Sequence, residues 1–267
     1  MLPFLKWPGG KRWFVTRYAQ LLPSKYRTYI EPFLGSGAVF FHLLPQKALL
    51  GDTNEELIAT YRAIRSDPAG VRRHLRNHHR SHDVEYYYAV RCASKRTGIT
   101  RAARFVYLNR TCFNGIYRVN LAGTFNVPIG TKTAVLLDSD DFGAVARILR
   151  RASLRPWDFE RLIDRAVAGD LVFADPPYTV RHNNNGFVKY NETLFSWADQ
   201  ERLAKALTRA AGRGVKVVAT NADHDEVAAL YHSPAYCLDH VERYSAISSD
   251  STSRRAYREL VVRANCD

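Results

Sequence analysis

A carboxylate, two prolines and a tyrosine follow one another at Asp175-Pro176-Pro177-Tyr178, directly after the apolar residues 171–174. Such a short apolar run predicts a buried strand, and in an α/β sheet the residue after a strand lies at the edge where ligands bind. The prolines remove two N–H donors and stiffen the backbone, so carbonyl oxygens and the carboxylate remain as acceptors beside an aromatic ring. This combination is suited to holding a planar amine. A rigid loop without chemistry is the alternative for an Asp-Pro turn alone.

Two glycines and a second carboxylate form another candidate site. Gly35 and Gly37 lie between a predicted strand at 28–30 and a helical run that extends to about residue 44. Glycines at such a turn let the backbone bend sharply and approach a ligand, although the third glycine of the dinucleotide fingerprint is missing. Asp52 follows the next predicted strand, where nucleoside sites place a carboxylate on ribose hydroxyls. The alternative is that Asp52 only caps the following helix. We expect Asp52 and Asp175 to open onto one pocket.

The net charge of the 267-residue chain is +13, and most of it is concentrated in one segment. Residues 60–120 hold thirteen Lys or Arg against three Asp or Glu, a local net charge of +10, with four histidines and Tyr86-Tyr87-Tyr88 interleaved. Cations neutralise phosphates and aromatic rings stack on bases, so this composition favours a nucleic-acid surface. Solvated helix faces are the alternative for any single arginine.

Metal-binding, disulfide-rich and membrane proteins are disfavoured. The four cysteines are far apart and form no ligand spacing, and the clustered histidines lack cysteines or carboxylates at ligand spacing. No window approaches the roughly 20 apolar residues of a membrane span. We therefore expect no metal, reduced thiols and a cytoplasmic protein, associated with the nucleoid when on DNA.

Strand and helix patterns alternate on both sides of the basic segment. Further strands are predicted at 153–156, 171–174, 215–219, 236–241 and 259–262, and helices at 11–22, 199–211 and 223–230. This order predicts an α/β fold with a doubly wound mixed sheet and a mostly helical basic insertion that carries a β-hairpin at 115–130. We expect residues 1–58 and 150–267 to form one catalytic domain and residues 59–149 to form the insertion.

Three motifs in this order, KWPGGK at 6–11, EPFLGSG at 31–37 and DPPY at 175–178, resemble those of the Dam-type DNA adenine methyltransferases. The segment 107–130 looks like that family's DNA-reading hairpin, and YSAISS at 244–249, before Arg254-Arg255, is similar to a further family segment. The resemblance implies the class I fold of methyltransferases that depend on S-adenosylmethionine. It also implies methyl transfer to the N6 amine of a flipped adenine in duplex DNA, with no metal.

The resemblance also implies roles for single residues. Asp175, Pro176, Pro177 and Tyr178 would hold the target adenine, and residues 181–190 would form a flap over it. The residues expected to contact S-adenosylmethionine are Trp7, Lys11, Phe33, Gly35, Gly37, Asp52, Asp158, Phe159 and Asp175. Those expected to contact DNA are Lys6, Phe113, Asn114, Ile116, Arg118 and Pro128. Ala122 and Thr131 stand where some relatives carry basic residues.

Arg118 has the clearest rationale, because a guanidinium can bond a guanine edge through two hydrogen bonds. Asn114, Arg118 and Pro128 together favour GATC, or a longer site that contains GAT. Two other functions stay open: methylation of an amine in RNA or of a protein amide on the same fold, and a catalytically inactive DNA-binding relative. We expect a monomer, and a cognate restriction endonuclease remains open as a partner.

Overall fold

The computed structural model describes residues 1–93, 98–120, 123–179, 195–244 and 256–266. Its strands are β1 (Tyr29–Glu31), β2 (Ala48–Gly51), β3 (Ala152–Arg155), β4 (Leu171–Ala174), β5 (Lys216–Ala222), β6 (Cys237–Tyr244) and β7 (Ala256–Ala264). Its α-helices are α1 (Arg12–Arg17), α2 (Ala38–Leu43), α3 (Glu55–Ser66), α4 (Pro68–Arg80), α5 (Val84–Cys92), α6 (Gly98–Thr111), α7 (Phe142–Leu149), α8 (Phe159–Ile163), α10 (Trp197–Gly212) and α11 (Asp225–Ala229). Two 3₁₀ turns are η1 (Ala19–Leu21) and η2 (Phe113–Gly115).

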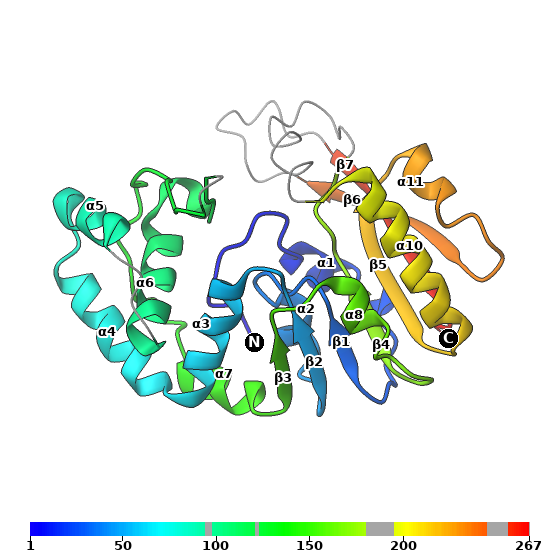
Figure 1. The fold of residues 1–267 in the computed structure, drawn as a ribbon, viewed down its shortest axis with the longest axis horizontal. Coiled ribbons are helices and arrows are strands. Elements are labelled where there is room, and N and C mark those ends of the chain that lie inside the picture. Colours follow the sequence, from blue (N-terminus) through cyan, green and yellow to red (C-terminus); the bar gives the residue numbers. More distant parts are fainter. Residues whose placement is uncertain (94–97, 121–122, 180–194, 245–255, 267) are drawn as a thin grey trace. The chain divides into compact units, whose positions relative to one another are not determined.

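The strands of the described residues form a mixed seven-stranded sheet in the order β3-β2-β1-β4-β5-β7-β6. β1 pairs in parallel with β2 and with β4, and β4 pairs in parallel with β5. β7 runs antiparallel to both β5 and β6. Helices alternate with strands along the chain, except for the consecutive helices α3 to α7 and the consecutive strands β6 and β7 (Figure 1). The predicted α/β class with a mixed sheet is confirmed.

Residue contacts divide the chain into two compact units. The helical unit comprises Met1–Arg12, Leu34–Gln46 and Asp52–Pro156, and the sheet unit comprises Trp13–Phe33, Lys47–Gly51 and Trp157–Asp267. The predicted division into residues 1–58 with 150–267 and an insertion at 59–149 stays a prediction.

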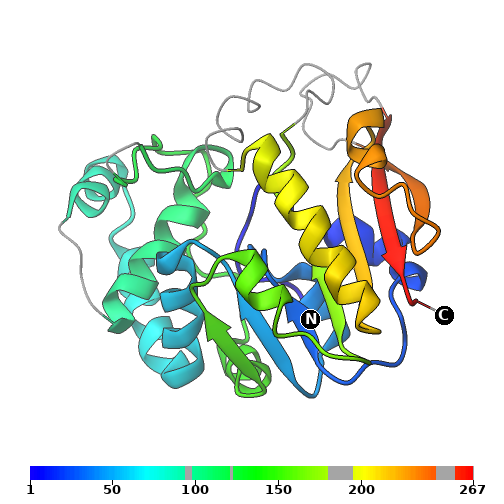
Figure 2. The same cartoon turned by 45° about the vertical axis from the view of Figure 1, so that its right-hand side comes forward.

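The sheet unit has an apolar core between its strands and α10. Val172, Val217 and Val262 of three strands are buried in the same cluster as Leu203 and Leu207 of α10. The leucines are four residues apart, so they lie on one face of the helix, and a capping box at its first turn fixes where the helix begins. Figure 2 shows α10, in yellow, lying across the strands of this unit.

The helical unit is built around α6, whose residues from Ala102 to Thr111 are buried apart from Arg104. Arg110 of this helix forms a buried ion pair with Asp140, at 2.5 and 2.7 Å, and it also donates to the carbonyl oxygens of Phe4 and Val135. A buried guanidinium with this many acceptors is compensated for its lost hydration. It therefore ties the amino-terminal segment to the helix core.

The described residues of the segment 115–130, which are 115–120 and 123–130, pair as predicted for a hairpin, with isolated bridges in place of continuous strands. Val119 pairs with Phe125 across the turn, and Cys112 pairs with Ile129 at its base. Phe125 is buried while its neighbours are exposed, so the predicted alternation after the turn is present.

The predicted helix at 11–22 is wrong in length, because α1 ends at Arg17 and a separate 3₁₀ turn follows. Tyr18 leaves the helical conformation at φ −129°, and its hydroxyl group exchanges two hydrogen bonds with the backbone of Glu242 on β6. This tertiary contact overrides the local helical pattern. The helices α7 and α8 are short, and their sequences did not lead to a helix prediction.

Within the described residues, no helix is both long and apolar enough to cross a membrane.

Candidate active site

Asp175 follows β4 directly, as the sequence predicts, and a neighbouring strand orients its carboxylate. The hydroxyl group of Thr220 on β5 donates to Oδ1 of Asp175 at 2.8 Å. Thr220 is fully buried, and the residues before both side chains, Ala174 and Ala219, are paired in parallel register. The acceptor therefore has a fixed direction at the carboxyl edge of the sheet.

Tyr178 is held by its hydroxyl group. It donates to Oε2 of Glu259 on β7 at 2.7 Å, and Arg243 on β6 bonds the other oxygen of Glu259 at 3.2 Å. Burial, followed by the nearby negative charges of Glu259 and Asp175, raises the pKa of Tyr178 well above its usual value. The phenol therefore stays protonated, and its ring is anchored in one place.

The backbone between these two residues is held from α10. The side-chain amide of Gln200 donates to the Pro177 carbonyl oxygen at 3.4 Å and to the Thr179 hydroxyl oxygen at 3.3 Å. Asn221 of β5 in turn donates to the Gln200 side-chain oxygen at 2.9 Å, and both amides are buried. Together with the buried Pro176, these bonds make the 175–179 loop a rigid element.

Phe33 and Phe159, two predicted cofactor residues, are brought together in the sheet unit. Their rings stack with centroids 5.4 Å apart, and Phe195 packs on both. Asp158 caps α8 and accepts from Arg202 at 2.9 Å, while the guanidinium of Arg202 lies over the Phe159 ring. β3 ends at Arg155, so Asp158 lies three residues beyond the strand, not directly at its end.

The glycine turn has little space beside it in the helical unit. Gly35 and Gly37 have φ of +46° and +67°, which favour glycine. A Cβ atom on Gly35 would lie 2.6 Å from Cδ1 of Trp7. The Gly35 amide donates to Oδ2 of Asp52 at 3.0 Å, and its carbonyl oxygen accepts from the buried Tyr61 hydroxyl group at 3.0 Å. Trp7, Gly35 and Asp52 are thus brought together as predicted site residues.

Asp52 is not the cap of the following helix. The N-cap of α3 is Asn54, whose side chain accepts from the Leu57 amide. Asp52 instead accepts from the backbone amides of Gly35 and Asn54 at 3.0 and 2.9 Å. Burial raises the pKa of Asp52 to about 6, against the lowering effect of these two bonds. The carboxylate therefore organises the glycine turn and titrates close to neutrality.

Trp7 and Lys11 occupy the amino-terminal motif of the helical unit. Trp7 stacks on Tyr117 and Phe105, with centroid distances of 6.3 and 6.4 Å. Lys11 is buried, and its ammonium group donates to the Gly9 carbonyl oxygen at 3.0 Å.

The predicted DNA-contacting residues gather at the start and end of the hairpin. Phe113 is 53% exposed, and its amide donates to the Pro128 carbonyl oxygen at 2.9 Å. Asn114 adopts a left-handed conformation with φ of +55°. A Cβ atom on Gly115 would lie 2.6 Å from Cδ of Lys6, so the Lys6 stem packs against this turn. Burial and the nearby Lys132 lower the pKa of Lys6.

Arg118 and Ile116 continue the hairpin. The Arg118 side chain is exposed and Ile116 is half-buried. The intervening Tyr117 is buried and points the other way, as alternation predicts.

The two units each hold one part of the predicted site. β2 and β4 both run parallel to β1, so Gly51 and Ala174 end at the same edge of the sheet. Asp52 and Asp175 are the next residues along the chain. That they open onto one pocket stays a prediction.

Several residues of this arrangement are not predicted from the sequence. Gln200 had a detectable signal, because it is a polar residue on the apolar face of a helix. Tyr117 had a weaker signal, because alternation along the hairpin places its side chain on the inward side. Thr220, Glu259 and Tyr61 gave none, because their roles depend on strand order and long-range contacts.

Three predicted segments lie outside the described residues. These are the flap at 181–190, the 245–249 part of the YSAISS segment with Arg254-Arg255, and Ala122.

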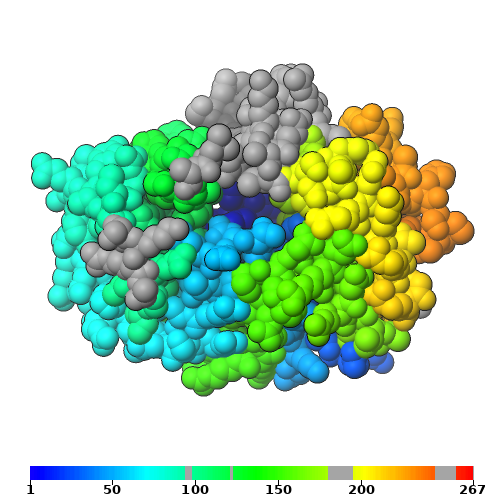
Figure 3. All heavy atoms as spheres, viewed as in Figure 1, coloured from blue at the N-terminus to red at the C-terminus, as the bar shows by residue number. Residues whose placement is uncertain are grey.

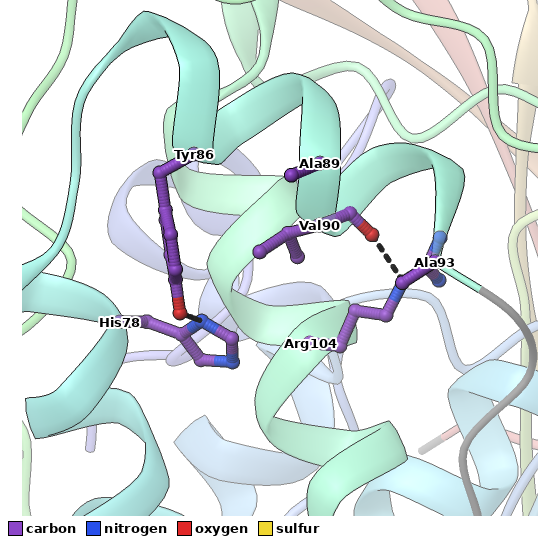
Figure 4. A pocket seen from close by; sticks show the side chains of 6 residues that line it. All are labelled: His78, Tyr86, Ala89, Val90, Ala93 and Arg104. Atoms are coloured by element: carbon purple, nitrogen blue, oxygen red, sulfur yellow. Dashed lines mark hydrogen bonds between the residues drawn. The ribbon is translucent and has the colours of Figure 1, made fainter.

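His78 of the basic segment takes part in packing. A hollow of about 170 Å³ between α4, α5 and α6 is lined by His78, Tyr86, Ala89, Val90, Ala93 and Arg104. Figure 4 shows Tyr86 bonded to His78, at 2.8 Å, and Arg104 bonded to the Val90 carbonyl oxygen. Among the described residues, no group of three or more His, Cys, Asp or Glu is arranged to hold a metal ion.

A family model and the sequences of named relatives indicate one family. Residues 7–247 match the model of the D12 class N6 adenine-specific DNA methyltransferases. A type II methyltransferase of Lactococcus lactis subsp. cremoris is 35% identical, over 97% of this chain and 94% of its own length. A DNA N-6-adenine-methyltransferase of Escherichia phage P1 is 34% identical over 96% of this chain and 34% of its own length. A DNA adenine methylase of Haemophilus influenzae is 28% identical over 97% of this chain and 92% of its own length.

Proposed function

The chain belongs to the D12 class N6 adenine-specific DNA methyltransferases, and we propose that it methylates a flipped adenine within GATC, or a longer site containing GAT, using S-adenosylmethionine. The observation that carries the proposal is the arrangement at the end of β4. A carboxylate oriented by Thr220 and a tyrosine anchored by Glu259 flank two prolines whose backbone is held by Gln200.

The exocyclic amine of adenine is a poor nucleophile, because its lone pair is delocalised into the ring. Asp175 and the carbonyl oxygen of Pro176 would accept its two N–H bonds and direct the lone pair toward the methyl group. They would also stabilise the positive charge that develops on the nitrogen. The fixed direction of the Asp175 carboxylate supports this role, since its preorganisation costs nothing during the reaction.

An adenine inside a duplex cannot reach this edge of the sheet, so the base must be extruded from the stack. Tyr178 would stack on the extruded base. Its hydrogen bond to Glu259 supports this role, because it fixes the ring plane before the base arrives.

The glycine turn suits S-adenosylmethionine in its chemistry. Asp52 supplies a carboxylate that can accept from ribose hydroxyls, and Trp7, which packs against Gly35, supplies an aromatic ring. Trp7 and Lys11 would lie near the methionine moiety, and Phe33, Phe159 and Asp158 near the adenine. When bound, S-adenosylmethionine supplies the electrophilic methyl group.

Substitution of Asp175 tests the function. Asp175→Ala is expected to bind duplex DNA nearly as the parent does and to lose transfer of labelled methyl groups to it. Glu201→Ala is the matched control, because Glu201 is an exposed carboxylate of α10 and should leave both properties unchanged. Near-normal turnover by Asp175→Ala would refute the assigned role.

The choice of substrate is tested separately. Labelled methyl transfer should reach duplex DNA and should leave RNA and protein unlabelled, and calorimetry should show S-adenosylmethionine binding. Sequencing of methylated DNA from cells that express only this protein should find N6-methyladenine within GAT. Labelling of RNA or protein in preference to DNA would favour the alternative substrates.

A further inference from the structure

One buried tyrosine connects the hairpin to the glycine turn. Tyr117 stands between Ile116 and Arg118, two predicted DNA contacts, but its own side chain is only 8% exposed. Its ring packs on Phe125 of the other hairpin arm, at 5.0 Å between centroids, and on Phe105 of α6, at 4.2 Å. The hairpin is therefore fixed to the helical unit through this ring.

The same ring reaches the glycine turn through Trp7. The planes of Tyr117 and Trp7 differ by 13°, so the two rings are stacked. Trp7 also contacts Gly35, so closely that a Cβ atom added to Gly35 would lie 2.6 Å from Cδ1 of Trp7. Because the contact between Trp7 and Gly35 leaves no free space, a shift of Trp7 toward Gly35 must move the glycine turn. The parallel packing of Tyr117 on Trp7 provides the route by which a shift of Tyr117 reaches Trp7.

The hydroxyl group of Tyr117 provides a second connection. It donates to Glu56 in the first turn of α3, and Glu56 also pairs with Arg101 at 3.1 Å. Burial, followed by the charge of Glu56, raises the pKa of Tyr117, so the phenol remains a donor. The cap of the same helix, Asn54, donates its backbone amide to Asp52. Ring and hydroxyl therefore both lead to the residues that shape the glycine turn.

We propose that Tyr117 is a positioning residue that couples the two ligands, so that duplex DNA on the hairpin tightens S-adenosylmethionine binding at the glycine turn, and the reverse. This rests on the proposed function. Such coupling is reciprocal, because both ligands favour the same arrangement of Tyr117, Trp7 and Gly35. We expect DNA to lower the Kd of S-adenosylmethionine about five-fold or more.

The test is a set of S-adenosylmethionine titrations with and without a duplex that contains GATC. The coupling ratio is the Kd of S-adenosylmethionine without DNA divided by its Kd with DNA. Tyr117→Leu removes both connections, and its coupling ratio should fall close to one. Tyr117→Phe keeps the ring and loses only the bond to Glu56, so its ratio should fall at least two-fold. Tyr236→Leu is the matched control, since Tyr236 of the sheet unit also packs on a ring, that of Tyr231, and also bonds a side chain, that of Thr208, and it should keep the parental ratio.

Each result decides the proposal. A parental ratio in Tyr117→Leu, or a parent protein whose two ligands bind independently, overturns it. If Tyr117→Leu proves unfolded by circular dichroism, Tyr117→Phe decides, and an unchanged ratio there overturns the proposal. If Tyr117 had only a structural role, its substitution would weaken the binding of both ligands and leave the coupling ratio unchanged. That result would also overturn the proposal. A parent that neither binds S-adenosylmethionine nor methylates DNA would instead refute the proposed function.

Discussion

Thr220 Oγ1 lies 2.8 Å from Asp175 Oδ1, so the carboxylate carried by one strand is oriented by a buried hydroxyl group on the next. Sequence separates the two residues by 45 positions, and the parallel pairing of β4 with β5 brings them together. The bond constrains the direction of the acceptor more than it contributes to binding, and this distinction can be measured.

Thr220→Val removes this bond and keeps the shape of the side chain. We expect kcat to fall about ten-fold and the KM of S-adenosylmethionine to stay unchanged. A ten-fold fall corresponds to about 1.4 kcal/mol in activation free energy, which is the contribution of one hydrogen bond. Thr220→Ser restores the hydroxyl group and should recover most of the rate. Equal losses in kcat with Val and with Ser would show that packing, not the hydroxyl group, matters at this position.

The pH dependence of cofactor binding should report on Asp52. Its pKa of about 6 is raised from 3.8, so the folded protein holds a proton on Asp52 at pH 5, where the unfolded chain has lost it. Folding therefore takes up a proton, and this group's contribution to stability falls as pH rises from about 4 to about 6. Ribose hydroxyls favour the ionised carboxylate, so S-adenosylmethionine affinity should fall up to ten-fold per pH unit below 6.

Asp52→Asn is the control for this titration. It should bind S-adenosylmethionine about ten-fold or more weakly at pH 8, because a bond to a charged acceptor is lost. Its Kd should be nearly constant between pH 5 and 7. A parental pH profile in calorimetric titrations of Asp52→Asn would assign the titration to another group.

A row of arginines on α4 should contribute binding to DNA without sequence preference. Arg72, Arg76 and Arg80 are exposed at four-residue intervals, and within the described part of the chain no ion pair joins them to a carboxylate. Like charges at this spacing destabilise a helix by about 0.2–0.5 kcal/mol per pair, a cost that a polyanionic partner would offset. Side chains of α4 lie on the surface drawn in cyan in Figure 3.

Replacing these three arginines by glutamine should reduce the salt dependence of DNA affinity, with a log–log slope smaller by up to about 0.9 per lost phosphate contact. Preference for GATC and kcat at saturating DNA should be unchanged. The matched control replaces the exposed Lys25, Lys47 and Lys205 of the sheet unit by glutamine, with the same change in net charge. If the slope decreased equally in both triple variants, the effect would come from the change in net charge and not from the position of the arginines on α4.

Local sequence patterns predicted the strands well, because apolar runs such as Leu171–Ala174 are buried on both faces of a parallel sheet. They also placed Asp175 correctly, since its position depends only on where β4 ends. They did not reveal Thr220, Gln200 or Tyr117, whose contacts join segments far apart in the chain. The early end of α1 has the same origin, because Tyr18 is held by β6.

The order of synthesis differs from the order of strands in the sheet. β6 is made before β7, yet β7 lies between β5 and β6. β6 therefore cannot join the sheet before β7 has paired with β5, and without β7 the edge of β5 stays open. An unpaired apolar edge is a template for aggregation. Removal of residues 256–264 should thus detach β6 as well, and the shortened chain should aggregate where the full chain stays monodisperse.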